Sequence, residues 1–175
     1  MEEYGVGMVG YGFIGKVHTY GYRNMSLYYD NLPFKVRLVG VCTSRMETAQ
    51  KAKEQGGFVF ATTDYKDLLS RKDIQIIDCS LPNYLHKDVV VAALKAGKHV
   101  YCEKPLALNL REANEIYEVA KDSGVRHQVT FQYRFIPAIM RAKQLIDEGS
   151  VGEMFSIRGV YLHSSCVVQP TRTAY

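Results

Sequence analysis

The sequence has few of the residues that mark special classes of protein. Only four cysteines and five prolines occur among 175 residues, and no apolar stretch approaches the roughly 20 residues of a membrane-spanning helix. Cys42, Cys79, Cys102 and Cys166 are far apart, with no CxxC pair and no histidine at zinc-ligand spacing. We therefore expect no metal site and no disulfide framework. The first three cysteines lie in or beside apolar runs, which favours buried, reduced thiols.

An excess of charge of one sign is also missing. The chain has 22 basic and 18 acidic residues, a net charge of +4, and the two signs are interspersed. Nucleic-acid-binding domains usually cluster Lys and Arg on one face, so this distribution argues against a nucleic-acid partner. The acidic start, Met1-Glu2-Glu3, lacks the positive charge of a secretory signal peptide. We expect a cytoplasmic protein with no membrane partner.

Short apolar runs alternate with longer amphipathic segments along most of the chain. The runs cover residues 4–9, 36–41, 58–61, 74–79, 99–102 and 125–131. Strands that are buried on both faces appear in a sequence as continuous apolar stretches, and the alternation with helices is typical of βαβ units. The pattern predicts an α/β fold with a doubly wound parallel sheet.

Helical segments between the runs carry recognisable end signals. We predict helices over residues 46–55, 64–69, 87–96 and 110–122. Asp64 and Asn109 stand where N-caps belong, and Gly97 and Gly124 stand where C-terminal glycines belong.

The rhythm changes after about residue 130. Residues 137–148 are predicted to form a helix, 149–152 a turn, and 153–162 a half-exposed strand because apolar residues alternate there. We expect residues 1–125 to form one domain and residues 126–175 to form the truncated beginning of a second α/β domain. The exposed apolar face of such a chain predicts a homo-oligomer.

A glycine motif follows the first apolar run directly. The residues are Gly10, Tyr11, Gly12, Phe13, Ile14 and Gly15, a GxGxxG between a predicted strand and a predicted helix. In this context the glycines allow a tight turn, a close approach to a pyrophosphate and close packing of helix on strand. The alternative is a strand-to-helix turn with no ligand. We favour dinucleotide binding in a Rossmann domain.

The end of the second predicted strand indicates which dinucleotide is bound. A carboxylate there would bond the ribose 2′-hydroxyl of NAD, but the residues are Thr43, Ser44 and Arg45. Hydroxyls and a guanidinium suit a 2′-phosphate, which favours NADP over NAD without excluding NAD. Asp30 lies at about the expected distance after the glycine motif, but it precedes the strand, in an expected loop over residues 24–34. Ser44 as a simple helix cap is the alternative interpretation.

A second motif carries a family resemblance. Residues 93–107, which include Glu103-Lys104-Pro105, closely resemble the Gfo/Idh/MocA oxidoreductase family. Residues 81–86 resemble its loop after the fourth strand, and residues 133–138 and 149–153 resemble the start of its second domain. With the glycine motif, the resemblance covers nearly the whole chain.

The resemblance implies an amino-terminal Rossmann domain that binds NAD or NADP and a carboxy-terminal α/β domain that holds a sugar-like substrate. It implies that Lys104 is catalytic and lies beside the substrate oxygen. A cation at that oxygen would stabilise the negative charge that develops as hydride leaves the carbon. Pro105 is implied to follow a cis peptide bond.

Further residues take roles from the same resemblance. Leu81, Pro82 and Asn83 would line the nicotinamide side, and Glu103 would orient Lys104 or meet the coenzyme ribose. His86 would face the cleft, or would be a solvated residue at a helix start. Arg134 would reach the coenzyme or an anionic substrate, or would pair structurally.

The resemblance predicts an oxidoreductase that transfers hydride between NADP(H) and a CH–OH or C=O group of a sugar- or polyol-like substrate. Family members continue further and supply a catalytic Asp and His that this chain does not match, and His163 lies in no matching motif. A non-catalytic NAD(P)-binding regulator is the alternative. A domain for S-adenosylmethionine is disfavoured by the start of a second domain after Phe131.

Overall fold

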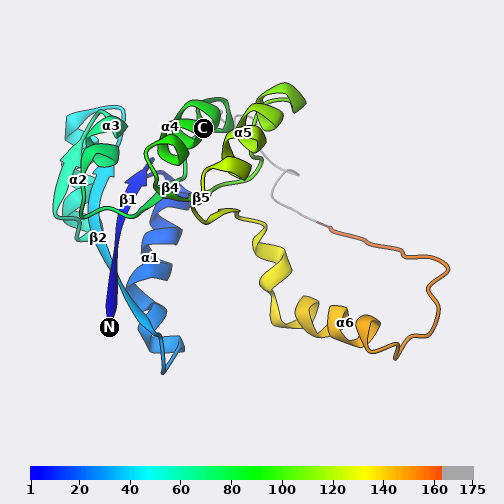
Figure 1. Cartoon of the computed structure of the whole chain (residues 1–175). Coiled ribbons are helices and arrows are strands. Elements are labelled where there is room, and N and C mark those ends of the chain that lie inside the picture. Colours follow the sequence, from blue (N-terminus) through cyan, green and yellow to red (C-terminus); the bar gives the residue numbers. More distant parts are fainter. Residues whose placement is uncertain (163–175) are drawn as a thin grey trace. The chain divides into compact units, whose positions relative to one another are not determined.

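The computed structural model describes residues 1–162, which fall into two compact units: Met1–Thr130, and a second unit that begins at Phe131. The first unit contains a six-stranded, fully parallel sheet with the order β3-β2-β1-β4-β5-β6 (Figure 1). The strands are β1 (Glu2–Val9), β2 (Phe34–Cys42), β3 (Phe60–Thr62), β4 (Ile76–Cys79), β5 (His99–Cys102) and β6 (His127–Val129). All six predicted strands are present, and the doubly wound α/β fold is confirmed.

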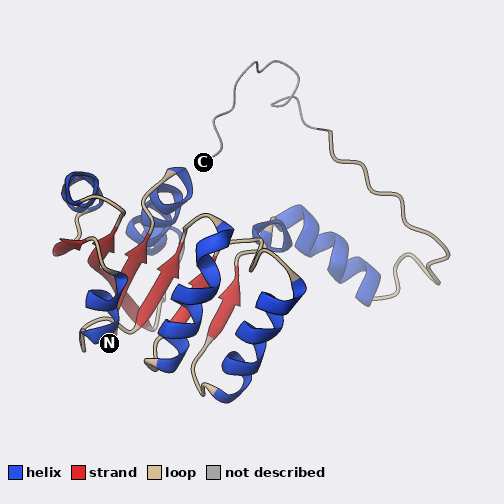
Figure 2. Ribbon diagram, turned by 90° about the horizontal axis from the view of Figure 1, so that it is seen from above, coloured by secondary structure: helices blue, strands red, loops and turns tan. Residues whose placement is uncertain are grey.

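Helices cover both faces of this sheet (Figure 2). They are α1 (Phe13–Tyr28), α2 (Met46–Gly56), α3 (Tyr65–Ser70), α4 (His86–Lys95) and α5 (Leu110–Asp122), with the short 3-10 turn η1 (Asn83–Leu85) before α4. Each strand-helix-strand crossover is right-handed as a rule, which places helices before and after the switch in strand order on opposite faces. The sheet is therefore buried from both sides.

The core consists of two clusters of buried side chains. The larger includes Ile74, Ile77, Val90, Leu94 and Ile116 and joins the sheet to α4 and α5. The smaller includes Val6, Met8, Val41, Ala52 and Phe58 and joins β1 and β2 to α2. Cys42, Cys79 and Cys102 are buried and free, as predicted, whereas Cys166 lies outside the described residues. The continuous apolar runs in the sequence reflect this two-sided burial.

The predicted helix ends are mostly confirmed. The Asp64 side chain accepts a hydrogen bond from Lys66 N, and that of Asn109 accepts one from Glu112 N. One boundary is wrong, because α1 continues to Tyr28 through part of the expected loop over residues 24–34. Residues 24–28 contain neither glycine nor proline, so no local signal ends the helix there.

The second unit contains the 3-10 turn η2 (Gln132–Phe135) and helix α6 (Pro137–Asp147). Gly149 and Gly152 adopt left-handed conformations with φ of 74° and 70°, which confirms the predicted turn. The predicted strand over residues 153–162 is wrong, since these residues form no strand. An alternating pattern forms a strand only where a neighbouring strand offers backbone partners, and the described residues supply none there.

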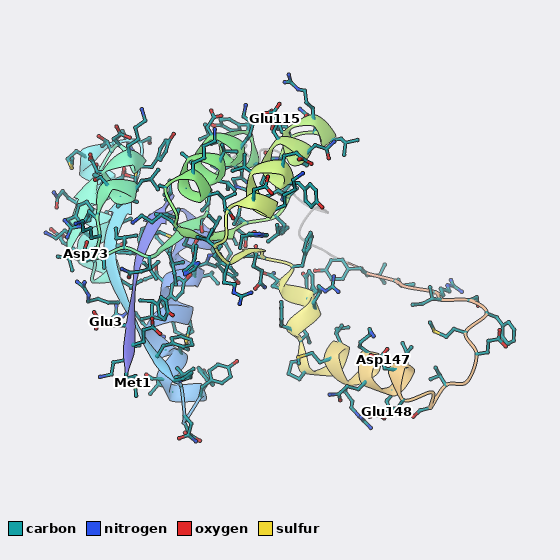
Figure 3. The ribbon with its side chains drawn as sticks, viewed as in Figure 1. Met1, Glu3, Asp73, Glu115, Asp147 and Glu148 are labelled. Atoms are coloured by element: carbon teal, nitrogen blue, oxygen red, sulfur yellow. The ribbon has the colours of Figure 1, made fainter. Side chains whose placement is uncertain are left out.

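Surface ion pairs lie at the amino-terminal edge of the sheet. Arg37 on β2 pairs with Glu3 on β1 at 2.9 Å and with Asp73 at 3.6 Å, and Figure 3 labels both acidic residues. All three side chains are more than a third exposed, so these pairs contribute little to stability. Within residues 1–162, no helix combines the length and the apolar character needed to cross a membrane.

Candidate functional site

The carboxyl ends of four parallel strands bring most of the predicted site residues to one edge of the sheet. Gly10 N donates to Cys42 O, Ser80 N to Val9 O, and Glu103 N to Cys79 O, each at 2.9 Å. These bonds hold the loops after β1, β2, β4 and β5 side by side. The predicted residues in these loops and in the first helical turns that follow them are Gly10, Gly12, Phe13, Ile14, Gly15, Thr43, Ser44, Arg45, Leu81, Pro82, Asn83, Glu103 and Lys104.

The glycine turn combines two crowded positions with one open position. Gly10 has φ of +92°, and a Cβ there would lie 2.7 Å from Ser80 O. A Cβ on Gly15 would lie 2.4 Å from Gly10 O, which only a glycine avoids. A Cβ on Gly12 would meet no atom within 4 Å. The backbone at Gly12 is thus open to a ligand, whereas Gly10 and Gly15 are required by the fold.

The amino terminus of α1 is free to meet an anion. Gly12 is its N-cap, no side chain caps it, and its first turn holds no acidic residue. Unpaired N–H groups and the positive end of the helix dipole favour a phosphate at such a position. Phe13 is exposed and Ile14 half-buried beside the turn. These residues fit the pyrophosphate of a dinucleotide.

The end of β2 presents hydroxyls and a guanidinium. The Thr43 hydroxyl donates to Arg45 O at 3.0 Å and lies 2.6 Å from the Thr48 hydroxyl. The N-cap of α2 is Arg45, without a side-chain cap, so the interpretation of Ser44 as a cap is wrong. The side chains of Ser44 and Arg45 are exposed and make no hydrogen bond or ion pair with residues 1–162. Asp30 precedes β2 and so belongs to the opposite edge of the sheet.

Lys104 follows β5 with an exposed side chain that forms no ion pair with the described part of the chain. The Lys104–Pro105 peptide bond is cis, as predicted. Lys104 N donates to the Glu103 carboxylate at 3.1 Å. Leu81, Pro82 and Asn83 are half-buried in the neighbouring loop. The ammonium group is therefore available to a ligand at this edge.

His86 does not face a cleft or solvent, and both of those expectations are wrong. Its side chain is completely buried at the start of α4. Nε2 lies 2.8 Å from Leu81 O and Nδ1 lies 3.1 Å from Pro105 O. The ring therefore ties the loop after β4 to the segment that follows Lys104. Direct contact between the ring and a coenzyme is excluded by this burial.

The sulfur atoms of Cys79 and Cys102 and the His86 ring lie within 4.8 Å of one another, an arrangement that the sequence spacing did not reveal. A metal ion would need a free imidazole lone pair and thiolates. Both His86 nitrogens face carbonyl oxygens, and a bond from Cys79 together with burial raises the pKa of Cys102. These three groups are therefore poor metal ligands.

Behind Lys104 lies a buried network that sequence reasoning missed. His18 on α1 has Nδ1 2.9 Å from Asp78 Oδ2 and Nε2 3.3 Å from Glu103 Oε1. Both carboxylates are nearly inaccessible to solvent. Hydroxyl donors complete the network: Tyr22 to Asp78 at 2.9 Å, Ser80 to Asp78 at 2.7 Å and Thr130 to Glu103 at 2.5 Å. An aspartate inside the apolar β4 run was the available signal, because a buried charge must be paired.

The network shifts the protonation of its members. Burial lowers the pKa of His18, but the hydrogen bond and charge of Asp78 and the charge of Glu103 outweigh it, so the pKa is raised. Burial, followed by the charge of Asp78, raises the pKa of Tyr22. Tyr22 thus stays protonated and acts as a hydrogen-bond donor.

Arg134 lies in η2 of the second unit. Its side chain is exposed and makes no hydrogen bond or ion pair with residues 1–162. The structural pairing considered for this residue is therefore not formed within the described residues.

Several known proteins are similar in sequence to this chain. Residues 4–131 match the Gfo/Idh/MocA family, described as an oxidoreductase family with an NAD-binding Rossmann fold. A levoglucosan dehydrogenase from Pseudarthrobacter phenanthrenivorans is 39% identical over 163 residues, 93% of this chain and 42% of that protein. An inositol 2-dehydrogenase/D-chiro-inositol 3-dehydrogenase from Lactiplantibacillus plantarum is 36% identical over 85% of this chain and 41% of that protein.

Solved structures of dehydrogenases have a similar fold. A levoglucosan dehydrogenase in complex with NADH and levoglucosan superposes with a TM-score of 0.85 at 36% identity, over 86% of this chain and 41% of that one. A myo-inositol 2-dehydrogenase from Lactobacillus plantarum gives a TM-score of 0.76 at 27% identity. The chain thus spans about two fifths of the length of these relatives.

Proposed function

The chain belongs to the Gfo/Idh/MocA oxidoreductase family, and from this premise we propose that it provides the coenzyme-binding part of a dehydrogenase for sugar- or polyol-like substrates. Two relatives are named as dehydrogenases of levoglucosan and inositol. The observation that carries the proposal is the convergence on one edge of the sheet of the open Gly12 turn and of Lys104, whose side chain forms no ion pair within residues 1–162. Ligands of open α/β sheets bind at this edge.

In the proposed reaction a CH–OH group becomes C=O. The carbon would lose a hydride, which an oxidised nicotinamide coenzyme would accept when bound, and the hydroxyl would lose its proton to solvent water. The Lys104 ammonium would donate a hydrogen bond to the substrate oxygen and stabilise its developing negative charge. Pro82 and Asn83 would border the nicotinamide, and Glu103 would hold the Lys104 backbone.

We propose that the second unit begins a substrate domain, after an amino-terminal coenzyme domain. Arg134 would serve there as a cationic contact for the coenzyme or for an anionic substrate.

For the coenzyme we propose NADP(H) in preference to NAD(H). The exposed Ser44 and Arg45 side chains, with no carboxylate at the end of β2, support this choice. A guanidinium binds phosphate oxygens in a fixed fork, whereas a ribose hydroxyl gains little from it.

The test is a fluorescence titration of the chain with NADPH and, separately, NADH. We expect saturable binding of both, with the lower dissociation constant for NADPH. Arg45→Ala should weaken NADPH binding by about tenfold or more and NADH binding much less, because only NADPH carries the 2′-phosphate. Arg111→Ala, at an exposed arginine on α5, is the matched control and should change neither. Equal losses for both coenzymes with Arg45→Ala would refute the NADP preference, and no binding of either would refute the coenzyme site.

A further inference from the structure

His18 connects the helix that begins at the glycine turn to the residue before Lys104. It lies in the second turn of α1, between Asp78 at the end of β4 and Glu103 directly after β5. Glu103 in turn accepts a hydrogen bond from Lys104 N at 3.1 Å. An ion pair from His18 to Glu103, followed by the hydrogen bond from Lys104 N, therefore joins α1 to the backbone of Lys104.

The geometry requires a proton on both ring nitrogens. A neutral imidazole has one N–H, and its other nitrogen carries a lone pair that repels a carboxylate. Here a carboxylate oxygen faces each nitrogen, at 2.9 Å and 3.3 Å. The doubly protonated ring donates a hydrogen bond to Asp78, forms an ion pair with Glu103 and places one positive charge between two buried negative charges. The raised pKa of His18 agrees with this arrangement.

Within residues 1–162, no other cation forms an ion pair with these carboxylates. Those facing His18 or its two partners are Tyr22 of α1, Asp78 and Ser80 at the end of β4, Tyr101 and Glu103 at the end of β5, and Thr130 after β6. All except the two carboxylates are neutral hydrogen-bond donors or aromatic groups. Loss of the His18 proton would leave two buried carboxylates without a counter-charge.

We propose that His18 is a positioning residue, held as an imidazolium, that fixes Glu103 and through it the backbone of Lys104. This role rests on the proposed function, since Lys104 matters as the catalytic lysine of a dehydrogenase. The folded state raises the pKa of His18 above its ordinary 6.5, so the interaction of the imidazolium with Asp78 and Glu103 is fully present below pH 6.5. It is lost as the pH rises through the raised pKa.

NMR of the whole chain without coenzyme tests this directly. At neutral pH the chemical shifts of the His18 ring nitrogens should show protons on both. As the pH rises through the His18 titration, the Lys104 amide should exchange with solvent about tenfold faster, after correction for intrinsic pH dependence. The reason is that Glu103, which accepts from this amide, loses the ion pair with His18 that holds it in place. A single-proton ring at neutral pH, or a Lys104 amide indifferent to the titration, would overturn the proposal.

A variant adds a second test. In His18→Gln the neutral amide cannot titrate, so the pH step at the Lys104 amide should disappear, and a step that persists would overturn the proposal. His127→Gln, at an exposed histidine on β6, should keep the step. If His18→Gln does not fold, the wild-type titration decides alone. Failure of NADPH and NADH to bind would refute the proposed function, whereas these spectra decide the role of His18 without either coenzyme.

Discussion

The glycines of the β1–α1 turn serve two separate purposes. Gly10 and Gly15 are required because a side chain at either would collide with backbone oxygen atoms. Gly12 has an ordinary φ of −75° and open space around it, so the fold itself does not require a glycine there. A glycine at this position is explained by a ligand that approaches the backbone closely.

Alanine substitutions should separate these purposes. Gly15→Ala should lower the free energy of unfolding by about 2 kcal/mol or more, because the new Cβ overlaps Gly10 O. Gly12→Ala should leave stability within about 0.5 kcal/mol of the wild type but abolish detectable coenzyme binding. Chemical denaturation and coenzyme fluorescence measure the two effects. Unchanged binding by Gly12→Ala would contradict the assigned approach of the pyrophosphate.

His86 should be important for stability although it does not touch the coenzyme. His86→Leu leaves at least one of the carbonyls of Leu81 and Pro105 buried without its donor, and we expect a loss of about 2–4 kcal/mol in the free energy of unfolding. His127→Leu, at an exposed position, should change it by less than about 0.5 kcal/mol. Urea unfolding of both variants tests this, and similar values for the two would show that the ring bonds contribute nothing.

Single residues explain why part of the site could be predicted and part could not. The motif glycines, Arg45 and Lys104 each come shortly after a predicted strand. Because parallel strands end at the same edge of the sheet, the sequence alone predicts that these residues lie there. His18 and Asp78 are sixty residues apart and meet only through packing. The burial of His86 is likewise a tertiary property, since a histidine at a helix start has the same local pattern whether it is covered or exposed.

At the scale of elements, the hydrophobic pattern predicted the six strands and the helices. Strands buried on both faces give continuous apolar runs, whereas helices buried on one face give apolar residues three and four positions apart. The strand predicted over residues 153–162 is not formed. Alternation of apolar and polar residues is a property of a single segment, whereas backbone pairing in a sheet needs a second strand. Helix ends marked by Asp64 and Asn109 were predictable because the capping bond is local.

The cap of α5 offers a test of this local logic. Asn109→Ala removes the acceptor for Glu112 N and should lower the free energy of unfolding by about 1 kcal/mol. Asn114→Ala, an exposed position inside the same helix, should be neutral or slightly stabilising because alanine has the higher helix propensity. Thermal and urea unfolding distinguish the two. A loss with Asn114→Ala as large as that with Asn109→Ala would contradict the capping role.

At the scale of the whole molecule, the chain exposes large apolar side chains after α6. Phe155, Ile157 and Leu162 are 92%, 84% and 90% exposed. Apolar surface of this kind favours association. We expect sedimentation to show oligomers whose fraction rises with concentration, and the Phe155→Ser, Ile157→Ser double variant to shift the chain toward monomer. A 19.8 kDa monomer at all concentrations would contradict this.

The edge of the sheet opposite the site has a practical use. Gly97 and Gly124 lie in exposed turns that lead into β5 and β6, with nothing within 4 Å of a side chain added at either. Because the strands are parallel, these turns point away from the loops that hold Gly12 and Lys104. A linker inserted at residue 124 would attach the protein to an electrode or a bead. Each attached molecule would then present the edge with Gly12 and Lys104 to the solution.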